Sequence, residues 1–339
     1  MCGIIGYSGP KEPLPILING LSRLEYRGYD SAGIAISDGN KITVEKKEGK
    51  LDVLKTHLKD NNIKGNIGIG HTRWATHGVP NDVNAHPHSD NNEEFAIIHN
   101  GIIENYAEIK KDLLEEGFEF KSDTDTEVVA VELSRKWNGE LLRTVTDVAK
   151  TLEGTYALVV TTTKEEGTIV AGRLMSPLVL GVGENEVFLA SDSAAILEHT
   201  NKMIFLENGD FVEIKNGEYK LFDADLNEIE REIQEIDWEV SEAEKLGYDH
   251  FMYKEILEQS EVIERTISGR IESTSKEIPI KQDEASKYEK IWIVACGTAY
   301  HAGLFGKDLF EKVLGVPVSV ELASELSLIH ISEPTRRIT

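Results

Sequence analysis

The sequence contains little cysteine, with only Cys2 and Cys296 among its 339 residues. The two lie nearly the whole chain apart, which gives neither a disulfide framework nor the short spacing of a zinc site. The chain also lacks a basic, apolar secretory leader, and no apolar run approaches the roughly 18 residues of a membrane span. These absences predict a soluble protein of the reducing cytoplasm.

Basic residues are also scarce, with 36 Lys and Arg against 60 Asp and Glu, and the net charge is −24. Binding to a phosphate backbone relies on clustered Lys and Arg, so this balance argues against a nucleic-acid partner and against an anionic membrane surface. Any phosphate ligand is expected in a local pocket, held by backbone N–H groups and hydroxyls. The chain length predicts two domains.

Apolar periodicity predicts that the first domain, 1–228, mixes many strands with several helices, as a compact α+β domain does. The segment 229–246 is strongly acidic and is predicted to be a solvated linker. Residues 290–299 are predicted to form a buried, parallel-type strand, with Cys296 as a core thiol, ahead of a helix. This pattern indicates that 247–325 begins a second, α/β domain.

Cys2 follows Met1 directly and is a candidate nucleophile. Removal of Met1 would leave a thiol and a free α-amino group on the same carbon. Their unperturbed pKa values are near 8.5 and near 8, so neutral pH offers a latent nucleophile with a base beside it. From the first residues alone, an accidental cysteine is the simpler interpretation, and the later motifs have to decide between the two.

Polar residues crowd the ends of predicted strands at 71–78 and 99–101, where rigid scaffolds carry functional sites. The cluster 122–127 is typical of a helix N-terminus. Taken singly, these residues have ordinary structural interpretations. Asn100 with Gly101 predicts a turn, Asp125 a helix cap and Trp74 a packing residue.

Several motifs follow one another along the chain: Met1-Cys2-Gly3-Ile4-Ile5-Gly6, Tyr26-Arg27-Gly28-Tyr29-Asp30-Ser31-Ala32-Gly33, His71-Thr72-Arg73-Trp74-Ala75-Thr76-His77-Gly78, His99-Asn100-Gly101-Ile102-Ile103-Glu104-Asn105 and Ser122-Asp123-Thr124-Asp125-Thr126-Glu127. Together they closely resemble the glutaminase domain of the glutamine–fructose-6-phosphate aminotransferase (isomerising) family, also called glucosamine-6-phosphate synthases. The resemblance continues through 250–256 and 295–303 to about Glu325. It implies an N-terminal-nucleophile fold of four layers (αββα), followed by a truncated α/β sugar-phosphate isomerase (SIS) domain.

The resemblance also implies roles for particular residues. Cys2 is expected to attack the side-chain amide of glutamine, and Asn100 and Gly101 are expected to donate hydrogen bonds to the resulting oxyanion. The expected substrate contacts are Arg73 to the α-carboxylate, Asp125 to the α-ammonium, Thr76 and His77 in a glutamine-binding loop, and Trp74 as a mobile lid. Arg27 is expected to support Cys2 without contacting the substrate. Thr298 is expected to hold the sugar phosphate, although Ala299 stands where the family usually has serine.

The implied reaction converts fructose 6-phosphate and glutamine to glucosamine 6-phosphate and glutamate, in hexosamine and cell-wall precursor synthesis. No cofactor is expected, and no metal either, because His86 and His88 have no further ligands at suitable spacing. A homodimer through the isomerase domain is the expected assembly. As truncated, only the glutaminase half is expected to work.

Other proteins share parts of this pattern. Glutamine phosphoribosylpyrophosphate amidotransferase, asparagine synthetase and glutamate synthase use the same N-terminal cysteine, but 26–33 and 295–303 argue against them. A non-catalytic sugar-phosphate sensor would be expected to have lost at least one site residue, and none is missing. The tail 326–339 departs from the family and reads like translated sequencing adapter, so we expect it to be non-native.

Overall fold

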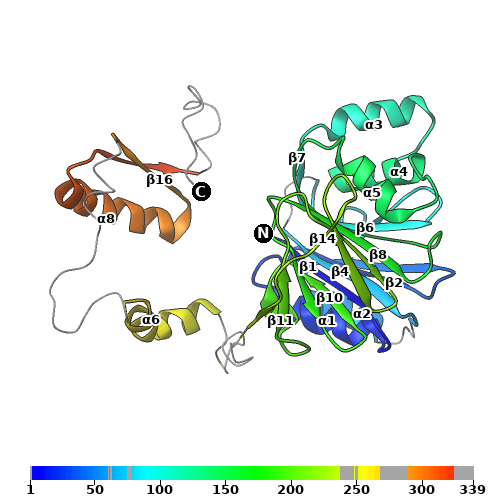
Figure 1. Cartoon of the computed structure of the whole chain (residues 1–339), viewed down its shortest axis with the longest axis horizontal. Coiled ribbons are helices and arrows are strands. Elements are labelled where there is room, and N and C mark those ends of the chain that lie inside the picture. Colours follow the sequence, from blue (N-terminus) through cyan, green and yellow to red (C-terminus); the bar gives the residue numbers. More distant parts are fainter. Residues whose placement is uncertain are drawn as a thin grey trace. The chain divides into compact units, whose positions relative to one another are not determined.

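The computed structural model describes residues 2–59, 61, 63–74, 78–236, 248, 251–267 and 289–323. The chain divides into two compact units, Met1–Lys254 and Glu255–Thr339 (Figure 1). Within the described ranges, no helix is long and apolar enough to cross a membrane. The predicted tail 326–339 lies outside them, as does the acidic segment from 237 to 246.

An antiparallel sheet in the first unit has the strand order β15-β11-β9-β10-β1-β4-β2-β3. Its strands are β1 (Gly3–Ser8), β2 (Ser31–Ser37), β3 (Ile42–Glu48), β4 (Ile67–Arg73), β9 (Val179–Val182), β10 (Val187–Ala190), β11 (Lys202–Phe205) and β15 (Gln234–Glu235). The strand that follows Cys2 is therefore central and fully buried. This placement fixes the chain immediately after Cys2 inside the fold.

A second antiparallel sheet has the order β14-β13-β12-β8-β7-β6-β5. Its strands are β5 (His88–Ser89), β6 (Phe95–Ile103), β7 (Gly154–Thr162), β8 (Thr168–Leu174), β12 (Phe211–Lys215), β13 (Glu218–Phe222) and β14 (Glu228–Ile229). The two sheets pack face to face through a buried apolar layer that includes Ile4 and Ile69 from one sheet and Ile98 and Val159 from the other. That layer is the centre of the unit.

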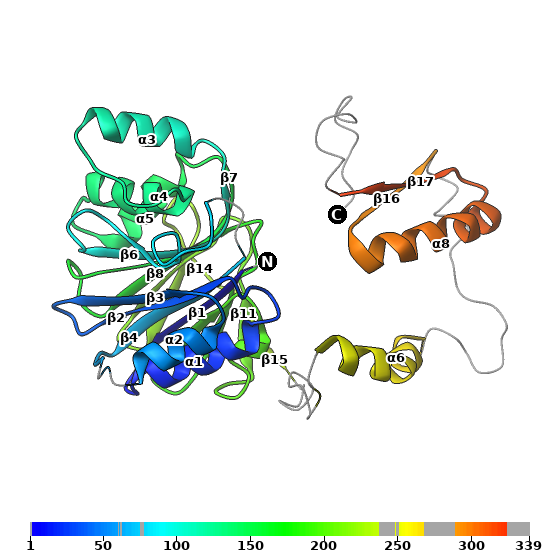
Figure 2. The ribbon, with the colours of Figure 1, turned by 180° about the vertical axis from the view of Figure 1, so that it is seen from behind.

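Helices cover the outer faces of both sheets (Figure 2). They are α1 (Pro13–Leu24), α2 (Leu51–Leu58), α3 (Tyr106–Glu115), α4 (Asp125–Arg135) and α5 (Leu141–Ala149). The first two pack on the first sheet, α4 and α5 pack on the second, and α3 packs on α4. The four-layer αββα arrangement predicted for this domain is confirmed.

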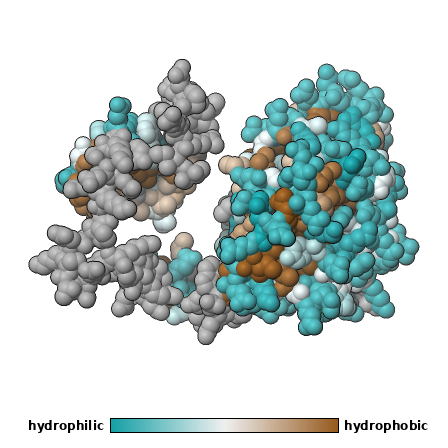
Figure 3. All heavy atoms as spheres, viewed as in Figure 1, coloured by the Kyte–Doolittle hydropathy of each residue, from teal (hydrophilic) through white to brown (hydrophobic). Residues whose placement is uncertain are grey.

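The acidic segment from residue 229 begins within the fold rather than after it. β15 pairs with β11 through Glu235 and Lys202, and Ile236 packs against the core beneath α1. The first unit therefore extends past the predicted end at residue 228. Hydrophilic residues predominate on its visible face, as the net charge leads one to expect (Figure 3).

The second unit contains a parallel pair of strands, β16 (Ile291–Ala295) and β17 (Val318–Leu322), joined by α8 (Gly297–Leu314). The helix α6 (Phe251–Ile267) precedes them and crosses the boundary between the units. A strand ahead of a helix was predicted here and β17 was not, and the strand predicted to be buried is half-exposed at Trp292 and Val294. Cys296, predicted to be a core thiol, is exposed.

Thr124 is the N-cap of α4, and this cap predicts a measurable stability effect. The Thr124 hydroxyl accepts a hydrogen bond from Glu127 N–H at 3.3 Å and lies 3.1 Å from buried His88 Nε2. Thr124→Ala should lower the free energy of unfolding by about 2 kcal/mol, because it removes the cap and a partner of a buried ring nitrogen. Chemical denaturation measures this loss. Lys50→Ala, at an exposed N-cap without a side-chain hydrogen bond, is the control that should change little.

Candidate active site

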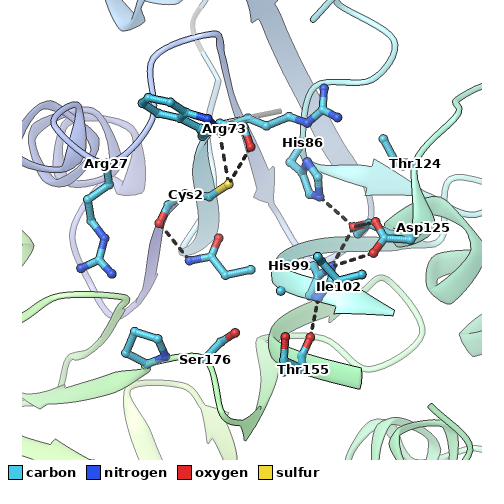
Figure 4. A pocket seen from close by; sticks show the side chains of 15 residues that line it. Cys2, Arg27, Arg73, His86, His99, Ile102, Thr124, Asp125, Thr155 and Ser176 are labelled. Atoms are coloured by element: carbon cyan, nitrogen blue, oxygen red, sulfur yellow. Dashed lines mark hydrogen bonds and ion pairs between the residues drawn. The ribbon is translucent and has the colours of Figure 1, made fainter. Parts of the chain in front are cut away.

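A cavity of about 270 Å³ lies where Cys2, the ends of β4 and β6, and the start of α4 meet (Figure 4). Its volume is below the roughly 300–1,000 Å³ typical of drug-sized ligands, which suits a single amino acid. The lining includes most of the predicted site residues: Cys2, Arg27, Arg73, Trp74, Asn100, Gly101 and Asp125. Residues far apart in the sequence thus converge on one pocket.

Cys2 is held against the end of β4 by the antiparallel pairing of β1 with that strand. Trp74 N–H donates a hydrogen bond to Cys2 Sγ at 3.2 Å, and the thiol lies 3.6 Å from Trp74 O. Burial raises the pKa of the Cys2 thiol, and the hydrogen bond from Trp74 opposes this shift. The thiol is therefore mainly protonated at neutral pH, and nucleophilic attack requires a base.

Asn100 and Gly101 lie within β6, which continues to Ile103, so the interpretation of these residues as a turn is wrong. Asn100 Nδ2 donates a hydrogen bond to Cys2 O at 3.0 Å. Gly101 has φ +133°, and a Cβ at this position would lie 2.0 Å from Thr155 O. The backbone beside Cys2 therefore accepts only glycine.

Arg73 and Asp125 place opposite charges in the wall of the cavity. Arg73 is the last residue of β4, is 4% exposed, and donates from Nη2 to Gly78 O at 3.3 Å. Asp125 is 6% exposed and accepts a hydrogen bond from Ile103 N–H at 2.9 Å. The helix cap is Thr124, not Asp125, so the capping interpretation does not account for this carboxylate.

Four predicted site residues of the first unit remain, and the structure describes two of them, Trp74 and Arg27. Trp74 is 48% exposed, and its ring makes a T-shaped contact with the ring of Tyr29, with centroids 5.4 Å apart. Thr76 and His77 lie outside the described residues. Arg27 is buried and donates from Nη1 to Asp192 Oδ2 at 2.9 Å.

Thr298 belongs to the second unit, where it is the second residue of α8. The helix begins at Gly297, within the range 290–299 that was predicted to be a strand, so Thr298 lies in its first turn. Backbone N–H groups in a first turn are available to an anion. Cys296 occupies the N-cap position and makes no side-chain hydrogen bond there.

Sequence reasoning missed two groups of supporting residues. Ser191 links the cysteine strand to the turn that holds Arg27, because Ile4 N–H donates to Ser191 Oγ at 3.0 Å and Arg27 Nη1 donates to Ser191 O at 3.3 Å. The second group is a set of buried histidines: His86 and His99 line the cavity, and His71 and His88 do not. The alternation of β4 could have revealed one of them, since His71 must share a face with Arg73.

Burial keeps these imidazoles neutral. It lowers the pKa of His71 to about 3, and it lowers the pKa values of His86 and His88 well below their usual range. The pKa of His99 is lowered as well, again by burial. No group of three His, Cys, Asp or Glu side chains in the described ranges is arranged to hold a metal ion.

Residues 56–238 match the sequence model of the glutamine amidotransferase domain family. The chain is 50% identical over 329 residues to a glutamine–fructose-6-phosphate aminotransferase (isomerising) of Clostridium perfringens, and 48% identical over 332 residues to a protein of the same name from Fusobacterium nucleatum. Each alignment covers 96% of this chain and 54% of the relative. The chain therefore spans about half the length of these relatives.

Solved structures give the same fold. The allosteric regulatory enzyme of purine biosynthesis superposes with a TM-score of 0.60 at 28% identity, covering 67% of this chain and 50% of the other. Glutamine phosphoribosylpyrophosphate amidotransferase from B. subtilis also gives 0.60, at 22% identity, covering 94% of this chain and 65% of the other. The latter likeness concerns the fold alone.

Proposed function

Because this chain belongs to the glutamine amidotransferase family, we propose that its cavity hydrolyses the side-chain amide of glutamine to glutamate and ammonia, with Cys2 as the nucleophile. The observation that carries the proposal is the contact between Cys2 and Asn100. Asn100 Nδ2 donates to the backbone carbonyl of Cys2, so an amide N–H₂ group that could donate to an oxyanion lies beside the cysteine, in a cavity that also presents a buried arginine and a buried aspartate.

The reaction begins once Met1 has been removed and Cys2 carries a free α-amino group. The amine takes the thiol proton, and the sulfur attacks the amide carbon of glutamine. Asn100 Nδ2 and the Gly101 N–H stabilise the tetrahedral oxyanion. Ammonia leaves with the proton returned by the amine, which gives a γ-glutamyl thioester. Water then attacks this thioester with the amine as base, and glutamate and the free thiol are regenerated.

Recognition of glutamine is assigned to the charged pair in the cavity wall. The Arg73 guanidinium would hold the α-carboxylate by two parallel hydrogen bonds, and Asp125 would accept hydrogen bonds from the α-ammonium. Thr76 and His77 would complete the glutamine loop, and Trp74 would close over it as a lid. Arg27 would support the cysteine strand through Ser191.

Arg73→Lys tests this assignment. Lysine keeps the charge but cannot make the two-pronged contact, so KM for glutamine should rise about 10- to 100-fold while kcat changes less. Steady-state glutamate release measures both constants. Arg135→Lys is the control, because Arg135 pairs with Glu132 and Glu116 away from the cavity. An unchanged KM in Arg73→Lys would remove Arg73 from the substrate site.

For the whole protein, the activity proposed is that of the named relatives: transfer of the ammonia to fructose 6-phosphate, giving glucosamine 6-phosphate. The second unit would begin the sugar-phosphate isomerase domain, with Thr298 and the first turn of α8 at the phosphate and a homodimer formed through that domain. No cofactor is proposed, and neither nucleic acid nor a membrane is a proposed partner. A cytoplasmic setting suits the two free cysteines, Cys2 and Cys296.

Glutamate release, measured with and without fructose 6-phosphate, tests the proposal. We expect this chain to release glutamate from glutamine and not to release aspartate from asparagine. A non-catalytic sugar-phosphate sensor would release no glutamate but would bind fructose 6-phosphate in calorimetry. Absence of glutamate release from protein shown by mass spectrometry to lack Met1 would overturn the proposed hydrolysis.

A further inference from the structure

His71 lies directly behind the amide that faces Cys2. It is fully buried on β4, and its Nε2 lies 3.0 Å from Asn100 Oδ1 and 3.1 Å from His99 O. It does not line the cavity, so it has no contact with the proposed substrate space. Its effect on any reaction there must pass through Asn100.

The hydrogen-bond pattern fixes both the tautomer of His71 and the orientation of the Asn100 amide. A backbone carbonyl can only accept, so the His71 nitrogen facing His99 O must carry hydrogen. The Asn100 atom facing that same N–H must then be the oxygen. At the other end of the amide, Cys2 O is also a pure acceptor and requires the Asn100 nitrogen at 3.0 Å.

The other ring nitrogen supports this assignment. His71 Nδ1 is buried and has no hydrogen-bond partner. A proton on Nδ1 would leave a buried donor unsatisfied and would also place the bare Nε2 lone pair against the oxygens of His99 and Asn100. Burial lowers the pKa of His71 to about 3, so the ring stays neutral with a single N–H across the working range of pH.

We propose that His71 is a positioning residue for the amidase reaction: its Nε2–H fixes the Asn100 amide so that N–H₂, and not C=O, faces Cys2 and the developing oxyanion. The inference rests on the proposed hydrolysis. Without this donor, the amide can rotate by half a turn and place its oxygen against the oxyanion, which repels it. His71 therefore acts on kcat, and glutamine binding is largely unaffected.

Two substitutions of His71 separate the hydrogen bond from packing. His71→Phe fills the space but has no donor, and kcat should fall about 10- to 100-fold while KM stays within about 3-fold. This loss stays below the roughly 10²–10³-fold expected for losing the oxyanion donor itself in Asn100→Ala. His71→Gln restores an N–H near the Nε2 position and should recover much of the rate. His199→Phe is the control, because the His199 ring stacks on Phe188 and does not line the cavity.

A double-mutant cycle tests whether His71 acts through Asn100. In the Asn100→Ala background, His71→Phe should cause no further loss of kcat. If the losses of the two single variants multiplied in the double variant, the inference would be overturned. A wild-type kcat in His71→Phe would overturn it as well. A different result would refute the proposed hydrolysis itself, namely glutamate release that survives both Cys2→Ala and Asn100→Ala.

A measurement on the unaltered protein keeps the inference testable if His71→Phe does not fold. Long-range ¹⁵N–¹H correlation NMR of histidine-labelled protein distinguishes the two neutral tautomers and the imidazolium. We expect the His71 ring to be neutral with its proton on Nε2 between pH 6 and about 8. A proton on Nδ1, or a charged ring, would overturn the inference.

Discussion

Replacing Cys2 by alanine should abolish glutamate release, with kcat/KM falling by at least about 10⁴-fold. The loss is this large because the sulfur forms the bond to the glutamine carbon, and the described cavity lining contains no second thiol. The fold should survive, since the thiol contributes only its hydrogen bonds to Trp74. Glutamate-coupled kinetics measure the rate, and thermal unfolding checks that the protein remains folded.

Cys296→Ala is the matched control for this prediction. Cys296 is the other cysteine of the chain and is exposed in the second unit. Its loss should leave glutamate release unchanged, so a thiol reagent that inactivates the enzyme must act at Cys2. Glutamate release that persists in Cys2→Ala would show that another group is the nucleophile and would end the proposed mechanism.

The elements of the first unit were largely predictable because each carries a local signal. Leu17, Leu21 and Leu24 recur at helical spacing, and α1 buries all three of them. The pairing between elements is different, because it depends on contacts that span most of the chain. β1 lies between β10 and β4, and no local pattern relates Ile5 to Ala190 or to Gly70.

The site residues could be named from sequence motifs, but the environment of each residue could not be predicted. The dipeptide of Asn100 and Gly101 is typical of a turn, yet nine-residue pairing with β7 holds it in a strand. His71 reads as one polar residue among several, and its relation to Asn100 exists only because β4 and β6 belong to facing sheets. The exposure of Cys296 has the same origin, because a strand motif specifies an apolar face and not the partner that covers it.

Gly101→Ala should be the most damaging substitution that leaves every polar group of the cavity in place. A Cβ would lie 2.0 Å from Thr155 O and 3.0 Å from His99 Nε2, and φ is +133°. Backbone strain and overpacking together should cost roughly 2–6 kcal/mol of stability.

The same clash should also remove activity, because relief of the contact with Thr155 requires β6 and β7 to separate beside Asn100. We expect kcat/KM to fall by about 10²–10³-fold, the effect of losing an oxyanion donor. Gly117→Ala provides the comparison, because its φ is +93° but nothing lies within 4 Å of the added Cβ. It should cost about 1 kcal/mol and leave glutamate release unchanged. If Gly101→Ala kept the wild-type kcat/KM, the backbone at residue 101 would not belong to the oxyanion site.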